Sequence, residues 1–198
     1  TKAMVPLKIA LATFAGLGAG LGIIFLVARF DDRFTSMNEV VEQFEEEIVG
    51  QVPDVTKTRT NGKLDLVEPD DARHMFAESY RNIRSSLLFM ATPGERPKVI
   101  LVTSATPSEG KSTVAANLAR TMAFAGSRVL LIDADLRRGK LHEFFGTRRG
   151  PGLAELLRHQ GHIKDFIIQD ALPNLFVIPS GEPISDSGEM FLSAGFDQ

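Results

Sequence analysis

The longest apolar stretch of the chain lies near its beginning. Residues 9–28 contain no charged side chain, and Lys8 and Arg29 flank them. A helix of about twenty residues rises about 30 Å, the hydrocarbon thickness of a bilayer. A signal peptide would have a shorter apolar core and a small-residue cleavage site, which residues 26–28 fit poorly. The pattern therefore predicts a transmembrane helix over residues 9–28, preceded by a short flank over residues 1–8.

Helical periodicity returns after this stretch. Ser36 and Glu39 are spaced as in a capping box. Apolar residues then recur at helical spacing, namely Met37, Val40, Val41, Phe44 and Ile48. A polar stretch over residues 50–62, with Pro53 in it, has the composition of a linker. We therefore expect residues 29–63 to form a juxtamembrane helix and a linker.

Residues 64–198 alternate between helical and strand-like patterns. A helix is expected to run from Asp70 or Asp71 to about Met90. Short apolar runs rich in β-branched residues are typical of buried strands, and they cover residues 98–104, 128–133 and 175–179. Helical patterns fill residues 112–125 and 152–158. This alternation predicts an α/β domain with a P-loop NTPase-like parallel sheet flanked by helices.

Composition excludes several kinds of function. The net charge is −3 and no Lys/Arg tract stands out, so nucleic acid is not an expected partner. The chain has no cysteine, which excludes disulfides and thiolate metal sites. Among its four histidines, only His159 and His162 have even a weak resemblance to zinc-ligand spacing.

Residues 105–113 read ATPSEGKST and stand between a predicted strand and a predicted helix. This is the context that a phosphate-binding loop requires, although Ala105 replaces the usual first glycine. Gly110 permits close approach to phosphate oxygens, Lys111 can contact the β- and γ-phosphates, and Ser112 can ligate Mg²⁺. The predicted ATP-binding residues are Thr106, Pro107, Ser108, Glu109, Gly110, Lys111, Ser112 and Thr113.

A second motif, Asp133-x-Asp135-x-Arg137, follows the second predicted strand. Ligands of open α/β sheets bind at the carboxyl ends of the strands, so this motif should lie beside the phosphate loop. We expect both carboxylates to project the same way, one holding Mg²⁺ and the other orienting an attacking hydroxyl. An acidic turn that only caps the strand end is the alternative. The predicted catalytic residues are Lys111, Asp133, Asp135 and Arg137, and the predicted metal ligands are Ser112 and Asp133.

Together, these motifs resemble those of bacterial tyrosine kinases. The Asp-x-Asp-x-Arg motif resembles the family's modified Walker A motif, and Glu78, Arg81 and Arg84 are spaced like its E-x-x-R-x-x-R motif. In the family, that helix packs into the neighbouring subunit of a ring. The resemblance therefore implies a homo-oligomer with these three interface residues on one helix face. Ion pairing within the helix is the alternative explanation.

The chain also resembles the polysaccharide chain-length and export regulators that carry such a kinase behind a transmembrane helix. This implies an ATP-dependent protein-tyrosine (auto)kinase that regulates exopolysaccharide or capsule polymerisation and export, with that machinery as its partner. ATP and Mg²⁺ are the implied cofactors. Because ATP is cytosolic, we expect the P-loop domain in the cytoplasm, the apolar helix in the bacterial inner membrane, and residues 1–8 outside.

Two other functions remain open. ATPases that partition chromosomes or place the division septum share the expected fold. However, they carry a lysine five residues before the phosphate-loop lysine, where this chain has Thr106, and they lack an N-terminal membrane span. A protein that has lost catalysis and serves as a scaffold for polysaccharide export is the third possibility.

The family's Walker B aspartate has no clear counterpart in the sequence. Asp170 follows an apolar run, but residues 175–179 resemble the strand that precedes Walker B, so we expect the true motif after Gln198. The family's tyrosine cluster is also missing, and the only tyrosine, Tyr80, lies on the apolar side of its helix. We therefore expect residues 64–198 to be a C-terminally incomplete kinase-like domain with weak ATP binding and little phosphoryl transfer.

Overall fold

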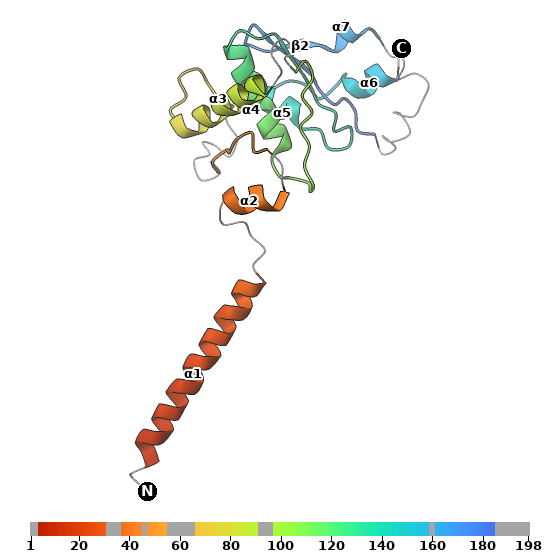
Figure 1. Cartoon of the computed structure of the whole chain (residues 1–198). Coiled ribbons are helices and arrows are strands. Elements are labelled where there is room, and N and C mark those ends of the chain that lie inside the picture. The colour runs from red at the N-terminus through yellow and green to blue at the C-terminus, as the bar shows by residue number, and fades with distance from the viewer. Residues whose placement is uncertain are drawn as a thin grey trace. The chain divides into compact units, whose positions relative to one another are not determined.

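The structure is a computed structural model of the chain, and it describes residues 4–30, 37–44, 47–54, 66–90, 97–158 and 161–184. Contacts within the chain divide it into two units, Thr1–Ile48 and Val49–Gln198. The first unit contains one long helix and one short helix, and the second contains helices packed on a small sheet (Figure 1).

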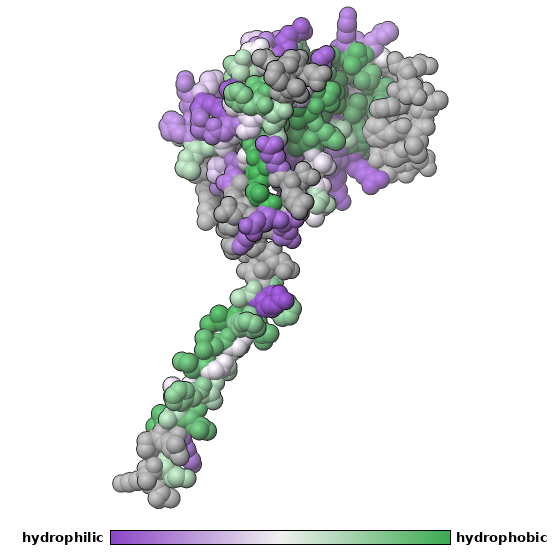
Figure 2. Space-filling model, in the orientation of Figure 1, coloured by the Kyte–Doolittle hydropathy of each residue, from purple (hydrophilic) through white to green (hydrophobic). Residues whose placement is uncertain are grey.

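Helix α1 (Met4–Arg29) contains the whole apolar stretch, so the helical part of that prediction is confirmed. Its segment Lys8–Arg29, 22 residues long, is apolar enough to cross a membrane by length and composition. Apolar side chains cover its surface, as the green colouring of Figure 2 shows, and Phe14 is 77% exposed. The Thr13 hydroxyl donates to the Ile9 carbonyl at 2.9 Å, so this polar group is satisfied inside the helix.

Helix α2 (Met37–Phe44) forms where the periodicity predicts it, but Ile48 is not helical. Ser36, the expected cap, lies outside the described residues. The first part of the predicted linker packs against the second unit rather than standing away from it. Val52 in the linker and Val49 just before it both contact buried residues there. A Cβ on Gly50 would lie 2.5 Å from Ile83 Cγ1, so this approach requires glycine.

The second unit is built on a sheet whose order, in the described part of the chain, is β1-β3-β2. Strand β1 (Val129–Ile132) pairs in parallel with β3 (Leu175–Ile178), with Val129 opposite Leu175 and Ile132 opposite Ile178. Both strands were predicted, and so was a parallel sheet, but not which strands lie side by side. The two-residue strand β2 (Ile168–Gln169) pairs antiparallel with β3 and was not predicted.

Helix α4 (Lys111–Phe124) lies between the sheet and another helix. Its residues Ala119 and Ala123 are buried against Leu175 and Val177 of β3. Small side chains on this face let the helix approach the sheet closely. Gly126, which the sequence places at the end of this helix, has a φ of +87°, so it supplies the left-handed residue that ends many helices.

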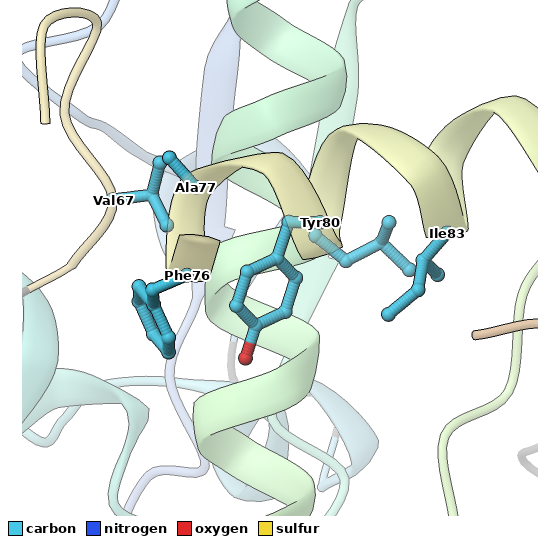
Figure 3. Close-up of a cluster of buried hydrophobic side chains, with 6 residues drawn as sticks. Val67, Phe76, Ala77, Tyr80 and Ile83 are labelled. Carbon is cyan, nitrogen blue, oxygen red and sulfur yellow. The ribbon is translucent and has the colours of Figure 1, made fainter. Parts of the chain in front are cut away.

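Helix α3 (His74–Phe89) packs on α4 away from the sheet. Figure 3 shows this cluster, in which Tyr80 lies beside α4 with its ring fully buried. The rings of Phe76 and Tyr80 meet edge to face with centroids 5.1 Å apart. The members of the cluster are Val67, Phe76, Ala77, Tyr80, Ile83 and Leu118. The apolar side expected for Tyr80 is therefore the buried face of this helix, and Met75, which is 81% exposed, lies outside it.

Two features of this region differ from the prediction. The N-cap of α3 is Arg73 rather than Asp70 or Asp71. Asp71 instead accepts a hydrogen bond from the Arg73 main-chain N–H at 2.8 Å. It also forms an ion pair with the Arg73 guanidinium at 2.6 Å. Burial alone would raise the pKa of Asp71. Hydrogen bonds from Arg73 and Glu68 outweigh this effect and hold the pKa of Asp71 below its usual value.

The predicted strand over residues 98–104 does not form. The segment pairs with no strand of the described sheet, and Val99 and Leu101 are 88% and 83% exposed. An apolar run becomes a strand only when a neighbour takes its backbone hydrogen bonds, and β1 pairs with β3. The prediction was wrong because the pattern reports the preference of the segment and not the presence of a partner.

Three short helices complete the unit. Helix α6 (Leu153–Leu157) was predicted, whereas α5 (Leu141–Phe145) and α7 (Ile163–Phe166) were not. Leu136, Ala154 and Ile184 form a small buried cluster beside α6. This cluster fixes the chain that follows the second acidic residue of the Asp-x-Asp motif.

Candidate nucleotide site

The phosphate loop enters α4 through two left-handed residues. Gly110, the N-cap of α4, has a φ of +95°, and Ser108 has a φ of +67°. The first helical residue is Lys111, so unpaired N–H groups at the start of a 14-residue helix face the loop. The N-terminus of such a helix carries a positive partial charge, which favours a phosphate group.

Side chains of the loop are bonded to one another. The Lys111 ammonium donates to the Ser104 hydroxyl at 2.9 Å and to the Thr106 carbonyl at 3.4 Å. Glu109 accepts the Thr106 hydroxyl at 2.6 Å, and this bond holds the pKa of Glu109 below its usual value. The charged groups therefore lie close to the loop's backbone. Pro107 and Ser108 are exposed, and Ser112 and Thr113 are half-buried in the first turn of α4.

Asp133 follows β1 directly and is buried, with 4% of its surface exposed. Its Oδ2 accepts the Leu141 N–H at 3.0 Å, and its Oδ1 accepts the Asp135 N–H at 3.3 Å. Burial raises the pKa of Asp133, and the hydrogen bonds offset only part of this effect. A Cβ on Gly139 would lie 2.6 Å from Asp133 Oδ2, so the loop after the motif folds tightly over this carboxylate.

Asp135 has different surroundings. It is exposed, and its Oδ1 accepts the N–H groups of Arg137 at 3.3 Å and Arg138 at 2.9 Å. We expected Asp133 and Asp135 to project the same way, but β1 ends at Ile132 and the chain then turns. The alternation of an extended strand stops before it reaches Asp135, which leaves one carboxylate inward and the other outward.

Topology brings the phosphate loop and the acidic motif toward one end of the unit. A short turn over residues 125–128 joins α4 to β1, and the two elements pack against each other. The strand must therefore run back along the helix, so Asp133 lies toward the end of α4 that carries Lys111. P-loop proteins bind nucleotides at such an end, where a helix N-terminus and the carboxyl end of a strand come together.

A protein family matches this part of the sequence. The family described as AAA domain matches residues 97–195, from the unpaired apolar run through the phosphate loop and beyond β3. The chain belongs to the AAA domain family. Its fold is that of a P-loop NTPase-like α/β domain, as its solved neighbours also show.

Relatives of this AAA domain protein include bacterial tyrosine kinases. EpsB of Ralstonia nicotianae is 33% identical over 202 residues, which cover 95% of this chain and 26% of EpsB. The succinoglycan biosynthesis transport protein ExoP of Rhizobium meliloti is 36% identical over 119 residues, which cover 60% of this chain and 15% of ExoP. The chain thus spans about a quarter or less of the length of these two proteins.

A solved structure shows the same relationship. The kinase domain of the Escherichia coli tyrosine kinase ETK superposes with a TM-score of 0.69 at 26% identity, covering 80% of this chain and 65% of that domain. The P-loop unit of this AAA domain protein is therefore of the bacterial tyrosine kinase type.

The helix with the E-x-x-R-x-x-R spacing presents only part of its motif. Arg81 pairs with Glu78 at 3.1 Å, and both side chains are about half exposed, at 46% and 56%. Arg84 instead donates to the Thr121 carbonyl of α4 at 3.3 Å. Each three-residue step turns by about 300° around a helix, so Arg84 lies about 120° from Glu78 rather than on the same face.

The hydrogen bonds that join α4 to the main chain of Val67 were not predicted from the sequence. Asn117 is 1% exposed, and its Oδ1 accepts the Val67 N–H at 2.7 Å. Arg120 donates from Nε to the Val67 carbonyl at 2.9 Å and pairs with Asp170 at 3.4 Å. A buried asparagine and an arginine inside an apolar helix pattern were the signals in the sequence. Asp170, the weak candidate for a metal ligand, is thus part of a structural ion pair.

Proposed function

We propose that the full-length protein is an ATP-dependent protein-tyrosine kinase of the bacterial P-loop type. The observation that carries the proposal is the N-terminus of α4. There the left-handed Gly110 precedes Lys111, the first helical residue, and the helix packs against β1, which ends directly before Asp133. The likeness to the ETK kinase domain supports phosphoryl transfer to tyrosine over other uses of this fold.

The residues of the site fit a magnesium nucleotide. Unpaired N–H groups at the start of α4 and the Lys111 ammonium match phosphate oxygens, and the Ser112 hydroxyl is a ligand type that Mg²⁺ accepts. Bound Mg·ATP supplies the γ-phosphoryl group. In our proposal, Lys111 would neutralise charge on the phosphates in place of its present contacts with Ser104 and Thr106, and Ser112 and Asp133 would hold the metal.

The outward position of Asp135 suits it to the incoming hydroxyl. Its exposed carboxylate is accessible to a tyrosine side chain, and it can orient the hydroxyl and take its proton. Asp133 fixes the turn that carries Asp135, because its two oxygens hold main-chain N–H groups on both sides of that turn. Arg137 then adds positive charge near the transferred group, which favours the transition state.

The proposal extends to where the protein works. Helix α1 is long and apolar enough to anchor it in the bacterial inner membrane, with the P-loop unit in the cytoplasm where ATP is available. Because ExoP is named for succinoglycan biosynthesis transport, we infer that the kinase regulates exopolysaccharide or capsule polymerisation and export. A homo-oligomer formed through the helix of Glu78, Arg81 and Arg84 completes the proposal.

Phosphotyrosine formation in the full-length protein tests the proposal. We expect incubation with Mg·ATP to produce phosphotyrosine, and we expect Lys111→Met to abolish it because the β- and γ-phosphates lose their cation. Asp135→Asn should lower the rate at least about 100-fold, the usual contribution of a general base. ATP hydrolysis without phosphotyrosine would instead identify a nucleotide switch, and ATP binding without turnover would identify a scaffold.

A further inference from the structure

Thr106 connects the two charged side chains of the phosphate loop. Its main-chain N–H donates to Glu109 Oε2 at 3.1 Å, and its hydroxyl donates to Glu109 Oε1 at 2.6 Å. Its carbonyl oxygen accepts the Ser104 hydroxyl at 2.9 Å and the Lys111 ammonium at 3.4 Å. The Glu109 carboxylate therefore accepts from both donors of Thr106, its N–H and its hydroxyl, while Lys111 donates to the Thr106 carbonyl oxygen.

These bonds span the least favourable part of the loop. Ser108 lies between Thr106 and Glu109 and has a φ of +67°, a conformation that residues with a side chain rarely adopt. A segment with such a residue relaxes unless its surroundings hold it. The loop is exposed on both sides of Ser108, so little packing can do this. The Glu109–Thr106 bonds close the turn over Pro107 and Ser108 and supply the missing restraint.

We propose that Glu109 is a positioning residue that holds the phosphate loop, through Thr106, in the form that receives the nucleotide. The inference rests on the nucleotide site proposed above. A loop that already has its bound conformation loses little conformational entropy when the phosphates bind. Less of the favourable contact energy is then offset, and the affinity is higher. The pKa of Glu109 lies below its usual value, so the carboxylate stays ionised and the bonds stay charge-assisted at neutral pH.

The charge of Glu109 has an opposing effect. A carboxylate near a triphosphate repels it, and this alone would make removal of Glu109 tighten binding. Glu109 is exposed, so water and salt weaken the repulsion. The hydrogen bonds to Thr106 are short and local, and solvent screens them less. We therefore expect the restraint to outweigh the repulsion.

Calorimetric titration of the full-length protein with Mg·ATP tests the inference. We expect Glu109→Ala to raise the dissociation constant about five- to tenfold, the scale of one hydrogen bond between neutral groups, because water weakens the charge assistance at this exposed position. Thr106→Val, which keeps the shape but loses the hydroxyl, should weaken binding by a smaller factor. Because both changes remove parts of one interaction, the double variant should bind no more than about twofold worse than Glu109→Ala alone.

Conservative variants and a charge control separate positioning from general damage. Glu109→Gln keeps one acceptor oxygen but loses the charge, so it should recover only part of the affinity that Glu109→Ala loses. Thr106→Ser keeps the hydroxyl donor and should bind within about twofold of the parent. Glu42→Ala removes the same charge from an exposed position on α2 and should change nothing. In Glu109→Ala, the melting temperature without nucleotide should stay constant, and KM for ATP should rise while kcat is retained.

Two results overturn the inference. One is that Glu109→Ala binds Mg·ATP at least as tightly as the parent, and the other is that the losses of affinity in Glu109→Ala and Thr106→Val add fully in the double variant. If the unsubstituted protein does not bind Mg·ATP, or binds it unchanged after Lys111→Met, the proposed function falls and this inference with it. Loss of binding in Lys111→Met with no effect of Glu109→Ala removes the inference alone.

Discussion

Asp133 and Asp135 are separated by one residue, yet their carboxylates meet different surroundings. Burial raises the pKa of Asp133, which makes its ionised form costly. Asp135 stays in water and holds only the turn that follows it. The pair is therefore divided into an inner group that sets geometry and an outer group that can meet a substrate.

Tyr80 gives a prediction about alkaline solution. Burial raises its pKa from 10.0 to about 12, with Asn117 and Arg73 offsetting only part of the effect. The unfolded chain then loses the phenol proton first, so the free energy of unfolding should fall between about pH 10 and about pH 12. At about 1.4 kcal/mol per pKa unit, the loss is at most about 3 kcal/mol.

Urea unfolding at about pH 9 and about pH 11.5, followed by circular dichroism, measures this loss. Tyr80→Phe keeps the ring and its edge-to-face contact with Phe76, and it should lose clearly less stability over the same interval. Equal losses in the two proteins would show that other groups, such as the lysines, account for the alkaline effect.

At the scale of elements, α4 organises the second unit. One face packs on β3, another packs on α3, and its N-terminus carries the phosphate loop. Asn117 and Arg120 tie the chain around Val67 to the same helix. Helix α4 is therefore held on several sides, by β3, by α3 and by the chain around Val67. These contacts keep its N-terminus, which carries the phosphate loop, in a fixed position.

The ion pair between Arg120 and Asp170 gives a prediction at this scale. Both side chains are largely buried, at 18% and 10% exposure, so removing one charge leaves the other poorly solvated. We expect Asp170→Asn to lower the free energy of unfolding by about 1–2 kcal/mol in urea, with Mg·ATP affinity unchanged. Glu143→Gln, at an exposed position of α5, should lie within about 0.5 kcal/mol of the parent. A fall in Mg²⁺-dependent binding would restore a metal role for Asp170.

The sequence predicted the elements whose pattern is local. Helices α3 and α4 and strands β1 and β3 follow from apolar spacing, from Gly126 and from short β-branched runs. The phosphate loop and the acidic motif were recognised because their residue types must occur at fixed spacing. The neighbours of each residue could not be read in the same way. Residues 98–104 have the pattern of a strand without a strand beside them, and Arg84 turns toward Thr121 because of helix pitch.

At the scale of the whole molecule, the first unit gives a prediction about topology. These 198 residues contain no cysteine, so a thiol introduced here is the only maleimide target within them. We expect Lys2→Cys to react with a membrane-impermeant maleimide in intact spheroplasts, and Ser127→Cys, exposed after α4, to react only after lysis. The reverse pattern would place the P-loop unit outside the cytoplasm and contradict an ATP-dependent function.

Assembly gives a second prediction at this scale. Glu78 and Arg81 pair with each other at the surface, a contact worth at most about 1 kcal/mol. Exchanging them in Glu78→Arg/Arg81→Glu keeps that pair but reverses the charges offered to a neighbouring subunit. We expect the mass measured by light scattering to fall to that of smaller species, while stability in urea changes by less than about 0.5 kcal/mol.

Arg84→Ala provides the comparison for this experiment. Because Arg84 bonds to the Thr121 carbonyl within the chain, its loss should lower stability, by about 1 kcal/mol. An unchanged mass in the exchanged variant would show that the Glu78–Arg81 pair serves the helix alone.

The closed position of Tyr80 has a consequence for mapping phosphorylation. It is the only tyrosine in these 198 residues, and its surface is 0% exposed. A phosphotyrosine assigned to this stretch by mass spectrometry therefore has a single possible position, and modification there requires the first half of α3 to separate from α4.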